Sequence, residues 1–359
     1  MSLRIGFVIG VLSTMLGLGT ATAGAGQLRL YNWADYTDPE LITEFEAETG
    51  VDVVTSTYTE ADVAEATLLA GGSGYDLAVI SLSSLVRMHE ADAVQALDWS
   101  RVENADGTDD RLRMLMRNSD ASAEEYTLLY LWGHTGIAYD EAAVRARVPD
   151  APLDSWRMIF DPQVAARLAD CGIGIVDSAD EVVSAALAYL GRDPLSKDAA
   201  DIEAAFQAIG AIAPYVKTFG STHYDALMAG EMCVAFTWNT EGIAPNIEGE
   251  NPDYRFIAPR EGTNLWYDVF VFPAGAANTE AAYSFMNFLY RPENMARLAE
   301  WGYSAGALPE ARALMSAELA DHPGIFPDLN ATSFYNLPQR SGAEKAAFDT
   351  RWRRALLGM

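Results

Sequence analysis

The chain has 359 residues, and 50% of them are apolar, which is enough for two lobes of about 150 residues each. Its 24 lysines and arginines stand against 51 aspartates and glutamates, giving a formal net charge of −27. Such an excess of negative charge excludes nucleic acid as a natural partner. It is compatible with a cationic ligand, although an acidic, well-solvated surface explains most of these charges equally well.

The first 25 residues have the pattern of a secretory signal. Arg4 supplies a positive start, an apolar run follows at 5–18, and small residues up to Ala23 or Ala25 fit a cleavage site. We therefore expect residues 1–25 to be removed on export. No later stretch approaches the roughly 18 uninterrupted apolar residues of a membrane span, so we expect a soluble, exported mature protein.

Strands and helices alternate in the next part of the chain. A strand at 28–31 is followed by Asp38 and Pro39, which are typical of a helix N-cap and first helical position, and Gly50 ends that helix. The alternation predicts a parallel sheet covered by helices. The further elements expected here are strands at 51–54 and 76–80 and helices at 61–69 and 84–91.

The middle of the chain predicts a crossing into a second α/β lobe. Two strand-like segments, 126–132 and 136–139, are joined through Gly133, His134 and Thr135, and a second alternating region follows as far as Pro259. Its expected elements are helices at 161–169, 180–190, 199–213 and 224–229, and strands at 173–176 and 233–238.

The last part of the chain is expected to return to the first lobe. Strands are predicted at 255–259 and 265–272, helices at 279–290 and 293–300, and an amphipathic helix at 343–356. We predict that lobe 1 comprises 26–135 and the return segment 259–305, lobe 2 comprises 136–258, and the C-terminal segment 306–359 packs on lobe 2. Two lobes joined by several crossings form a cleft, where such folds bind ligands.

Cys171 and Cys233 are the two cysteines of the sequence, and both lie in the part expected to be exported. An oxidising compartment favours a disulfide between them, which would stabilise the fold by about 4 kcal/mol in the chain-entropy model. Two buried thiols are the alternative.

Motifs for enzymatic chemistry are missing from the sequence. The four histidines, at 89, 134, 223 and 322, are scattered, and neither a Walker A loop nor a G-x-S-x-G elbow occurs after the signal. We therefore expect neither a metal nor a cofactor. A carboxylate pair could still serve as acid and base in a secreted hydrolase, with Glu181 or Asp268 as a member.

Three tryptophans are each followed within three positions by a carboxylate, near the end of an expected strand. The three pairs are Trp33 with Asp35, which Tyr36 follows, Trp238 with Glu241, and Trp266 with Asp268. An ammonium group takes a negative partner and accepts the face of an aromatic ring, and a hydrocarbon stem packs on the same ring. Each pair alone could be a core aromatic followed by a helix cap. Together they predict a site for an organic cation.

Five segments, in order along the chain from Leu28 onward, resemble the periplasmic spermidine/putrescine-binding proteins of ABC transporters. They are YNWADY (31–36), YDLAVISLS (75–83), Cys171 with DSADEV (177–182), GEMCVAFTW (230–238) and WYDVF (266–270). The resemblance implies a two-lobed α/β periplasmic binding protein of type II, a Venus flytrap with the ligand in the cleft between the lobes. It further implies a monomeric receptor that is not an enzyme, binds spermidine or putrescine, and presents it to a membrane permease.

Carried over position by position, the resemblance also implies a set of ligand-binding residues. Trp33, Asp35, Tyr36 and Ser83 would form the wall of the first lobe. Glu181, Trp238 and Glu241 would form the opposite wall. Trp266 and Asp268, on the return strand, would lie on the first lobe, and Tyr303 would be a further contact. Asp180 is adjacent to Glu181, and we assign the ligand contact to Glu181 and a helix cap to Asp180.

Three positions depart from the family or distinguish its members. Ala34 stands where the family usually has a hydroxyl residue, and Glu241 stands where an aspartate is common. Trp266 resembles the spermidine-preferring members, which slightly favours spermidine over putrescine. The alternatives are a receptor for another cationic or sugar ligand and the secreted hydrolase.

Overall fold

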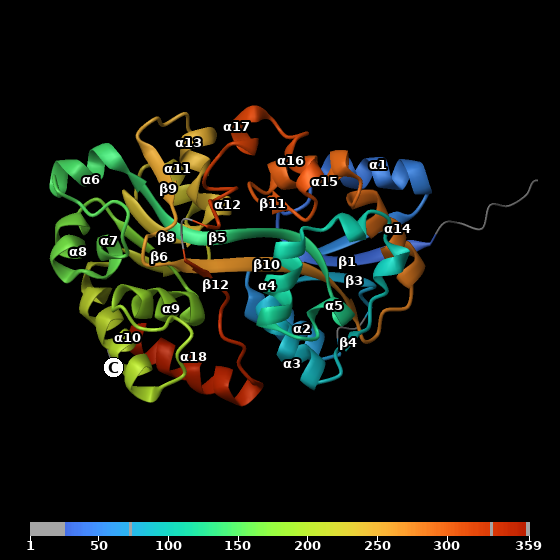
Figure 1. Ribbon diagram of the computed structural model, residues 1–359, viewed down its shortest axis with the longest axis horizontal. Helices are drawn as coiled ribbons and strands as arrows, with labels where there is room; N and C mark the ends of the chain where they lie inside the picture. Colours follow the sequence, from blue (N-terminus) through green and yellow to red (C-terminus); the bar gives the residue numbers. More distant parts are fainter. Residues whose placement is uncertain (1–25, 72–73, 331–332, 357–359) are drawn as a thin grey trace, which may run out of the picture.

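The computed structural model describes residues 26–71, 74–330 and 333–356 (Figure 1). The signal expected at 1–25 lies outside these ranges. Within them, no helix is both long and apolar enough to cross a membrane. Each helix and strand expected from the sequence has a counterpart, and most bounds differ by one or two residues; β2 runs on to Tyr58.

The strands form a mixed sheet in the order β2-β1-β3-β10-β5-β8-β6-β7. In lobe 1, β1 (Gln27–Trp33) pairs in parallel with β2 (Asp52–Tyr58) and β3 (Leu77–Ser81). In lobe 2, β6 (Ile173–Val176) pairs in parallel with β7 (Thr218–Gly220) and β8 (Val234–Trp238). The expected parallel pairing is therefore confirmed for these strands of each lobe.

Two long strands connect the lobes, and they run antiparallel to each other and to the lobe strands β3 and β8 beside them. β5 (Leu128–Asp140) pairs first with β10 (Thr263–Pro273) and then with β8, while β10 continues alongside β3. The predicted parallel sheet does not extend to these two strands, because the chain leaves lobe 1 along β5 and returns along β10 in the opposite direction. The two strand-like segments expected around Gly133 are one continuous strand.

The helix after β1 shows how local sequence sets the boundaries of an element. In α1 (Pro39–Thr49), Asp38 caps the start by accepting a hydrogen bond from the backbone N–H of Glu40, and Pro39 occupies the first turn. Gly50 ends the helix with a left-handed φ of 71°, a conformation that glycine adopts without a steric penalty. Leu41 and Phe45 are buried against the sheet.

Helices cover both faces of the sheet (Figure 1). In chain order they are α2 (Ala61–Leu69), α3 (Leu85–Glu90), α4 (Asp110–Ser119), α5 (Ala123–Tyr126), α6 (Glu141–Arg147), α7 (Arg157–Phe160), α8 (Pro162–Leu168), α9 (Ala179–Tyr189), α10 (Ala199–Ile212), α11 (Tyr224–Met228), α12 (Asn239–Gly242), α13 (Ala244–Ile247), α14 (Thr279–Leu289), α15 (Pro292–Trp301), α16 (Pro309–Arg312), α17 (Ala317–Ala320) and α18 (Gly342–Leu356). The remaining strands are β4 (Val94–Gln95), β9 (Tyr254–Ile257), β11 (Ala305–Gly306) and β12 (Phe334–Tyr335).

The C-terminal segment divides between the lobes. α16 contacts α15, whereas α18 lies on α9 and α10, and its Phe348 and Trp352 are buried in the core of lobe 2. The expected disulfide is confirmed: Cys171 and Cys233 are joined, with their Cα atoms 5.4 Å apart. It ties the turn after α8 to the start of β8.

Candidate ligand-binding cleft

A cavity of about 960 Å³ lies where the strands of the two lobes end, and all ten residues predicted to bind ligand line it. Trp33 ends β1, Asp35 and Tyr36 follow it, and Ser83 follows β3. From the other side, Glu181 comes from the first turn of α9, while Trp238 and Glu241 lie at the end of β8 and in α12. Trp266 and Asp268 come from β10, and Tyr303 follows α15.

The cavity wall is acidic and aromatic. None of the lining residues is a lysine, arginine or histidine. A wall with these properties attracts a positively charged ligand with an apolar stem. The carboxylates are Asp35, Glu181, Asp225, Glu241, Glu248, Asp268 and Glu300, and the aromatic residues are Trp33, Tyr36, Tyr58, Tyr224, Trp238, Trp266, Tyr267, Trp301 and Tyr303.

Glu181 is a buried carboxyl group held by two side chains at the crossing strands. Its side chain accepts hydrogen bonds from Asn264 Nδ2 at 2.9 Å and from Thr135 Oγ1 at 3.1 Å, and the residue is 4% exposed. Burial raises the pKa of Glu181 to about 7, against the lowering effect of these hydrogen bonds. A cation in the cavity would favour its ionised form.

Asp268 is also buried, at 8% exposure, and burial raises its pKa to about 7. The Tyr36 hydroxyl and the Trp33 indole are close enough to oppose this rise, but neither donates a hydrogen bond of good geometry to the carboxylate. The Trp33 indole N–H, the Tyr36 hydroxyl and the Trp266 indole N–H are buried without a hydrogen-bond partner within the described ranges. The surroundings of Asp268 are therefore polar but unsatisfied, as expected of a ligand site.

Gly133 lets β5 pass close to this wall. A side chain at this position would collide with the Trp266 ring and with Asn239 Oδ1. Asn239 in turn accepts a hydrogen bond from the backbone N–H of His134 at 3.1 Å and donates one to the Tyr303 carbonyl at 2.7 Å. Tyr303 has a left-handed φ of 45°, so Asn239 fixes a strained residue of the wall to β5.

Glu241 and Asp35 lie in different environments. Glu241 accepts hydrogen bonds from the His223 backbone N–H at 2.9 Å and from Thr237 Oγ1 at 3.0 Å, so it also holds the start of α11. Asp35 is exposed at the rim, where its carbonyl accepts a hydrogen bond from Trp301 Nε1 at 2.9 Å. Ser83 is hydrogen-bonded to Ser81 through their hydroxyls, at 3.1 Å.

The predicted helix cap by Asp180 is wrong. Ser178 is the N-cap residue of α9, and Asp180 lies in the first turn, where its Oδ1 accepts a hydrogen bond from Arg340 Nε at 2.6 Å. The carboxylate is therefore engaged with the C-terminal segment. Glu181, not Asp180, lines the cavity.

Several lining residues were not found from the sequence. Gln339 is one: its Oε1 is buried without a hydrogen-bond partner in the described part of the chain, while its Nε2 donates to Ser119 Oγ at 3.2 Å. Tyr224 is another, and its hydroxyl donates to Glu248 Oε2 at 2.5 Å. Neither belongs to an aromatic-acid pair at a strand end. The position of Gln339 depends on how the C-terminal segment folds back over the cleft.

Comparison with known proteins agrees with this architecture. A family model described as bacterial extracellular solute-binding protein matches residues 40–327. The putrescine-binding periplasmic protein PotF of Escherichia coli is 35% identical over 338 residues, covering 92% of this chain and 91% of PotF. The corresponding protein SpuD of Pseudomonas aeruginosa is 33% identical, with 96% of this chain and 98% of SpuD covered.

A solved structure supports the same assignment. The spermidine/putrescine ABC transporter substrate-binding protein PotD from Streptococcus pneumoniae superposes with a TM-score of 0.77 at 25% identity, over 93% of this chain and 99% of PotD. This confirms the expected two-lobed fold. The relatives are solute receptors, so the alternative of a secreted hydrolase has no support among them. The chain belongs to the family of bacterial extracellular solute-binding proteins.

Proposed function

We propose that this protein is the periplasmic receptor of an ABC transporter, that it binds a polyamine between its lobes, and that it delivers the polyamine to the permease. The observation that carries the proposal is the cavity wall, which combines seven carboxylates with nine aromatic side chains and contains no lysine, arginine or histidine. The named relatives support it, since they are putrescine- and spermidine-binding proteins.

The contacts available in the cavity are sufficient for tight binding. We assign the ligand contacts to the ten lining residues predicted from the sequence. A cation over an aromatic ring contributes about 0.5–2 kcal/mol, and a hydrogen bond to a charged group about 1.5–3 kcal/mol. A few of each reach about −8 kcal/mol, which corresponds to micromolar affinity, after the cost of association.

The length of the preferred amine is a separate part of the proposal. The sequence slightly favours spermidine on the basis of Trp266. The relatives at 33% to 35% identity are named for putrescine or agmatine, and those at 30% for spermidine and putrescine together. Putrescine and spermidine are therefore the two ligands to compare directly.

Calorimetric titration tests the proposal. The mature protein should release or take up heat with putrescine or spermidine at micromolar concentration, and should give no heat with neutral sugars. Absence of heat with putrescine, cadaverine, spermidine and spermine would overturn the proposal. Heat with a sugar alone would establish the sugar-receptor alternative, and consumption of the ligand would point to the hydrolase.

A further inference from the structure

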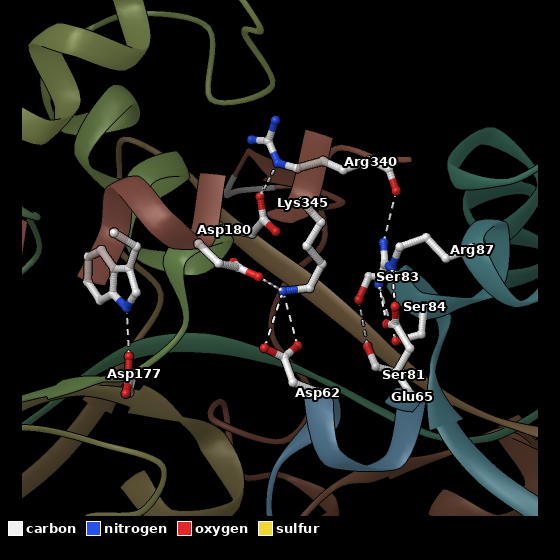
Figure 2. A network of polar contacts seen from close by, with 12 residues as sticks. Asp62, Glu65, Ser81, Ser83, Ser84, Arg87, Asp177, Asp180, Arg340 and Lys345 are labelled. Carbon is white, nitrogen blue, oxygen red and sulfur yellow. Dashed lines mark hydrogen bonds and ion pairs between the residues drawn. The ribbon is translucent and has the colours of Figure 1, made fainter. Parts of the chain in front are cut away.

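Arg340 stands between the cavity and the C-terminal helix. Its side chain is 8% exposed, its Nε donates to Asp180 Oδ1 at 2.6 Å, and its guanidinium lies over the ring of Phe348 at 3.8 Å. Its backbone carbonyl accepts a hydrogen bond from Arg87 Nη1 at 3.0 Å (Figure 2). Because Asp180 and Phe348 belong to lobe 2 and Arg87 to lobe 1, Arg340 connects the lobes.

The partner in lobe 1 is itself firmly held. Arg87 on α3 forms a two-pronged pair with Glu65 on α2, at 2.5 and 2.6 Å, and both side chains are largely buried (Figure 2). Arg87 Nη1 points out of this pair toward the Arg340 carbonyl. Leaving an N–H group of a buried arginine without a partner costs free energy. Separation of the lobes would break this hydrogen bond and is therefore disfavoured at this point.

Two more contacts join lobe 1 to the C-terminal segment. Lys345 on α18 lies 3.0 Å from Asp62 Oδ1 on α2, and Gln339 Nε2 donates to Ser119 Oγ on α4 (Figure 2 shows the lysine contact). α18 is fixed to lobe 2 by Trp352, whose Nε1 donates to Asp177 Oδ1 at 2.7 Å. We call Asp62, Arg87 and Ser119 of lobe 1, together with Gln339, Arg340 and Lys345, the interlobe latch.

The latch lies directly beside the cavity. Gln339 lines the cavity, and Glu181 lines it next to Asp180, the partner of Arg340. On lobe 1, Ala61 lines the cavity next to Asp62. Opening the cleft would part α2 and α3 from α18, and the three contacts of the latch would break together.

We propose that Arg340 is a positioning residue that orients Glu181 and Gln339 toward the ligand, and that the interlobe latch favours the closed arrangement of the lobes. The effect on affinity rests on the proposed function; the effect on closure does not. The latch lies outside the aromatic-acid constellation, although Ser119 and Gln339 also line the cavity. It changes the affinity by changing the fraction of molecules that are closed.

A double-mutant cycle on Asp62 and Lys345 tests the latch. The Asp62 side chain is 65% exposed, so Asp62→Asn should leave the fold intact. We expect Asp62→Asn and Lys345→Met each to raise the Kd for putrescine or spermidine about two- to fivefold, and the double variant to raise it no further. Asp349→Asn is the matched control, because it removes only the 2.8 Å pair of Lys345 within α18. Additive effects, or an equal effect of the control, would overturn the latch.

Arg340 needs a test that separates positioning from stability. Arg340→Met leaves Asp180 buried and unpaired, so it should lower both affinity and melting temperature. Adding Asp180→Asn removes the unpaired charge and should restore the melting temperature. The Kd should then remain about tenfold above that of the wild type if Arg340 positions Glu181 and Gln339. Recovery of both quantities would make Arg340 merely structural and would overturn its assigned role.

The separation of the lobes can be measured without any ligand. Ala47 on α1 and Ala166 on α8 are exposed and lie on different lobes, so spin labels on Ala47→Cys and Ala166→Cys report the distance between the lobes (Figure 1). In the unliganded protein, Asp62→Asn should shift this distribution toward longer distances. An unchanged distribution would overturn the latch. Failure of every amine to bind the wild type would instead count against the proposed function.

Discussion

Glu181 and Asp268 are two carboxyl groups that the fold makes difficult to ionise. Burial raises the pKa of each to about 7, from ordinary values of 4.5 and 3.8. In the unliganded protein, the folded state therefore binds more protons than the unfolded state between about pH 4 and pH 7. The stability that these two groups contribute should fall as the pH rises through that window. An ammonium ligand opposes the rise in the two pKa values, because it stabilises the ionised form of each carboxyl group.

Replacing Asp268 by asparagine should weaken amine binding by more than about tenfold, since it removes a charge from the cavity. The melting temperature of the unliganded variant at about pH 8 should equal or exceed that of the wild type, because the amide avoids the cost of a buried charge. The gain in melting temperature over the wild type should shrink as the pH falls toward about 4. Calorimetry and thermal melting measure the two effects. Asp110→Asn, at an exposed acid outside the cavity wall, is the control. Parallel loss of stability and binding would make Asp268 structural.

The affinity for a polyamine should increase with pH between about 6 and 8. The ligand's amines stay protonated in this range, whereas Glu181 and Asp268 lose their protons, so binding should release protons. Titration in buffers of different ionisation enthalpy at about pH 6.5 measures that release. The variant carrying both Glu181→Gln and Asp268→Asn should show neither the release nor the pH dependence. A wild-type affinity that does not change with pH would contradict this account.

At the scale of residues, the sequence identifies the cavity wall where an aromatic ring is closely followed by an acid, as at Trp33 and Trp266. Glu181 was identified through the family resemblance, because it has no aromatic neighbour to mark it. Gln339 is marked neither by an aromatic-acid pair nor by the family resemblance. Its place in the wall depends on contacts of the C-terminal segment with α4 and β10, and such long-range packing cannot be derived from local sequence.

Elements with strong local signals were predicted well. The cap residues Asp38 and Gly50 define α1, and the alternation of strands and helices gives the order within each lobe. The four-residue α12 escaped prediction because so short a helix has no periodicity, although it carries Glu241 into the cavity. The C-terminal helix α18 was expected at 343–356 and occupies Gly342–Leu356.

The disulfide should stabilise lobe 2 without affecting the ligand. It closes a loop of 62 residues between α8 and β8, and neither cysteine lines the large cavity. We expect Cys171→Ala with Cys233→Ala to lower the free energy of unfolding by about 4 kcal/mol, and to change the Kd for the amine less than about twofold. Urea unfolding measures the first effect. A thiol reductant should lower the urea midpoint of the wild type only, and a similar drop in the double variant would contradict the prediction.

For the whole molecule, the sequence predicts two lobes but not the direction of the strands that join them. Alternating strands and helices correctly indicate the parallel pairing of β1 with β2 and β3, and of β6 with β7 and β8. The antiparallel β5 and β10 arise because one strand leaves lobe 1 and the other returns, and the sequence of a strand does not record its direction relative to a distant partner. The mixed sheet thus follows from the topology of the crossings.

The net charge of −27 and the acidic cavity should make binding sensitive to salt. Raising sodium chloride from about 0.05 to about 0.5 M should weaken putrescine binding by about tenfold or more, because salt screens the attraction between the exposed parts of the cleft and the diamine. Spermidine, with one more charge, should lose more. A calorimetric series in salt measures both. Equal Kd values across the series would show that the charges of the protein do not contribute to binding.

Tryptophan has an uneven distribution in this molecule. Trp33, Trp238, Trp266 and Trp301 border the cavity, and they are half of the 8 tryptophans of the chain. The near-ultraviolet emission of the protein is therefore weighted toward the surface that a ligand would cover. Loading of the receptor should change its intrinsic fluorescence without any attached dye, so the chain is a ready-made optical sensor for the solute it carries.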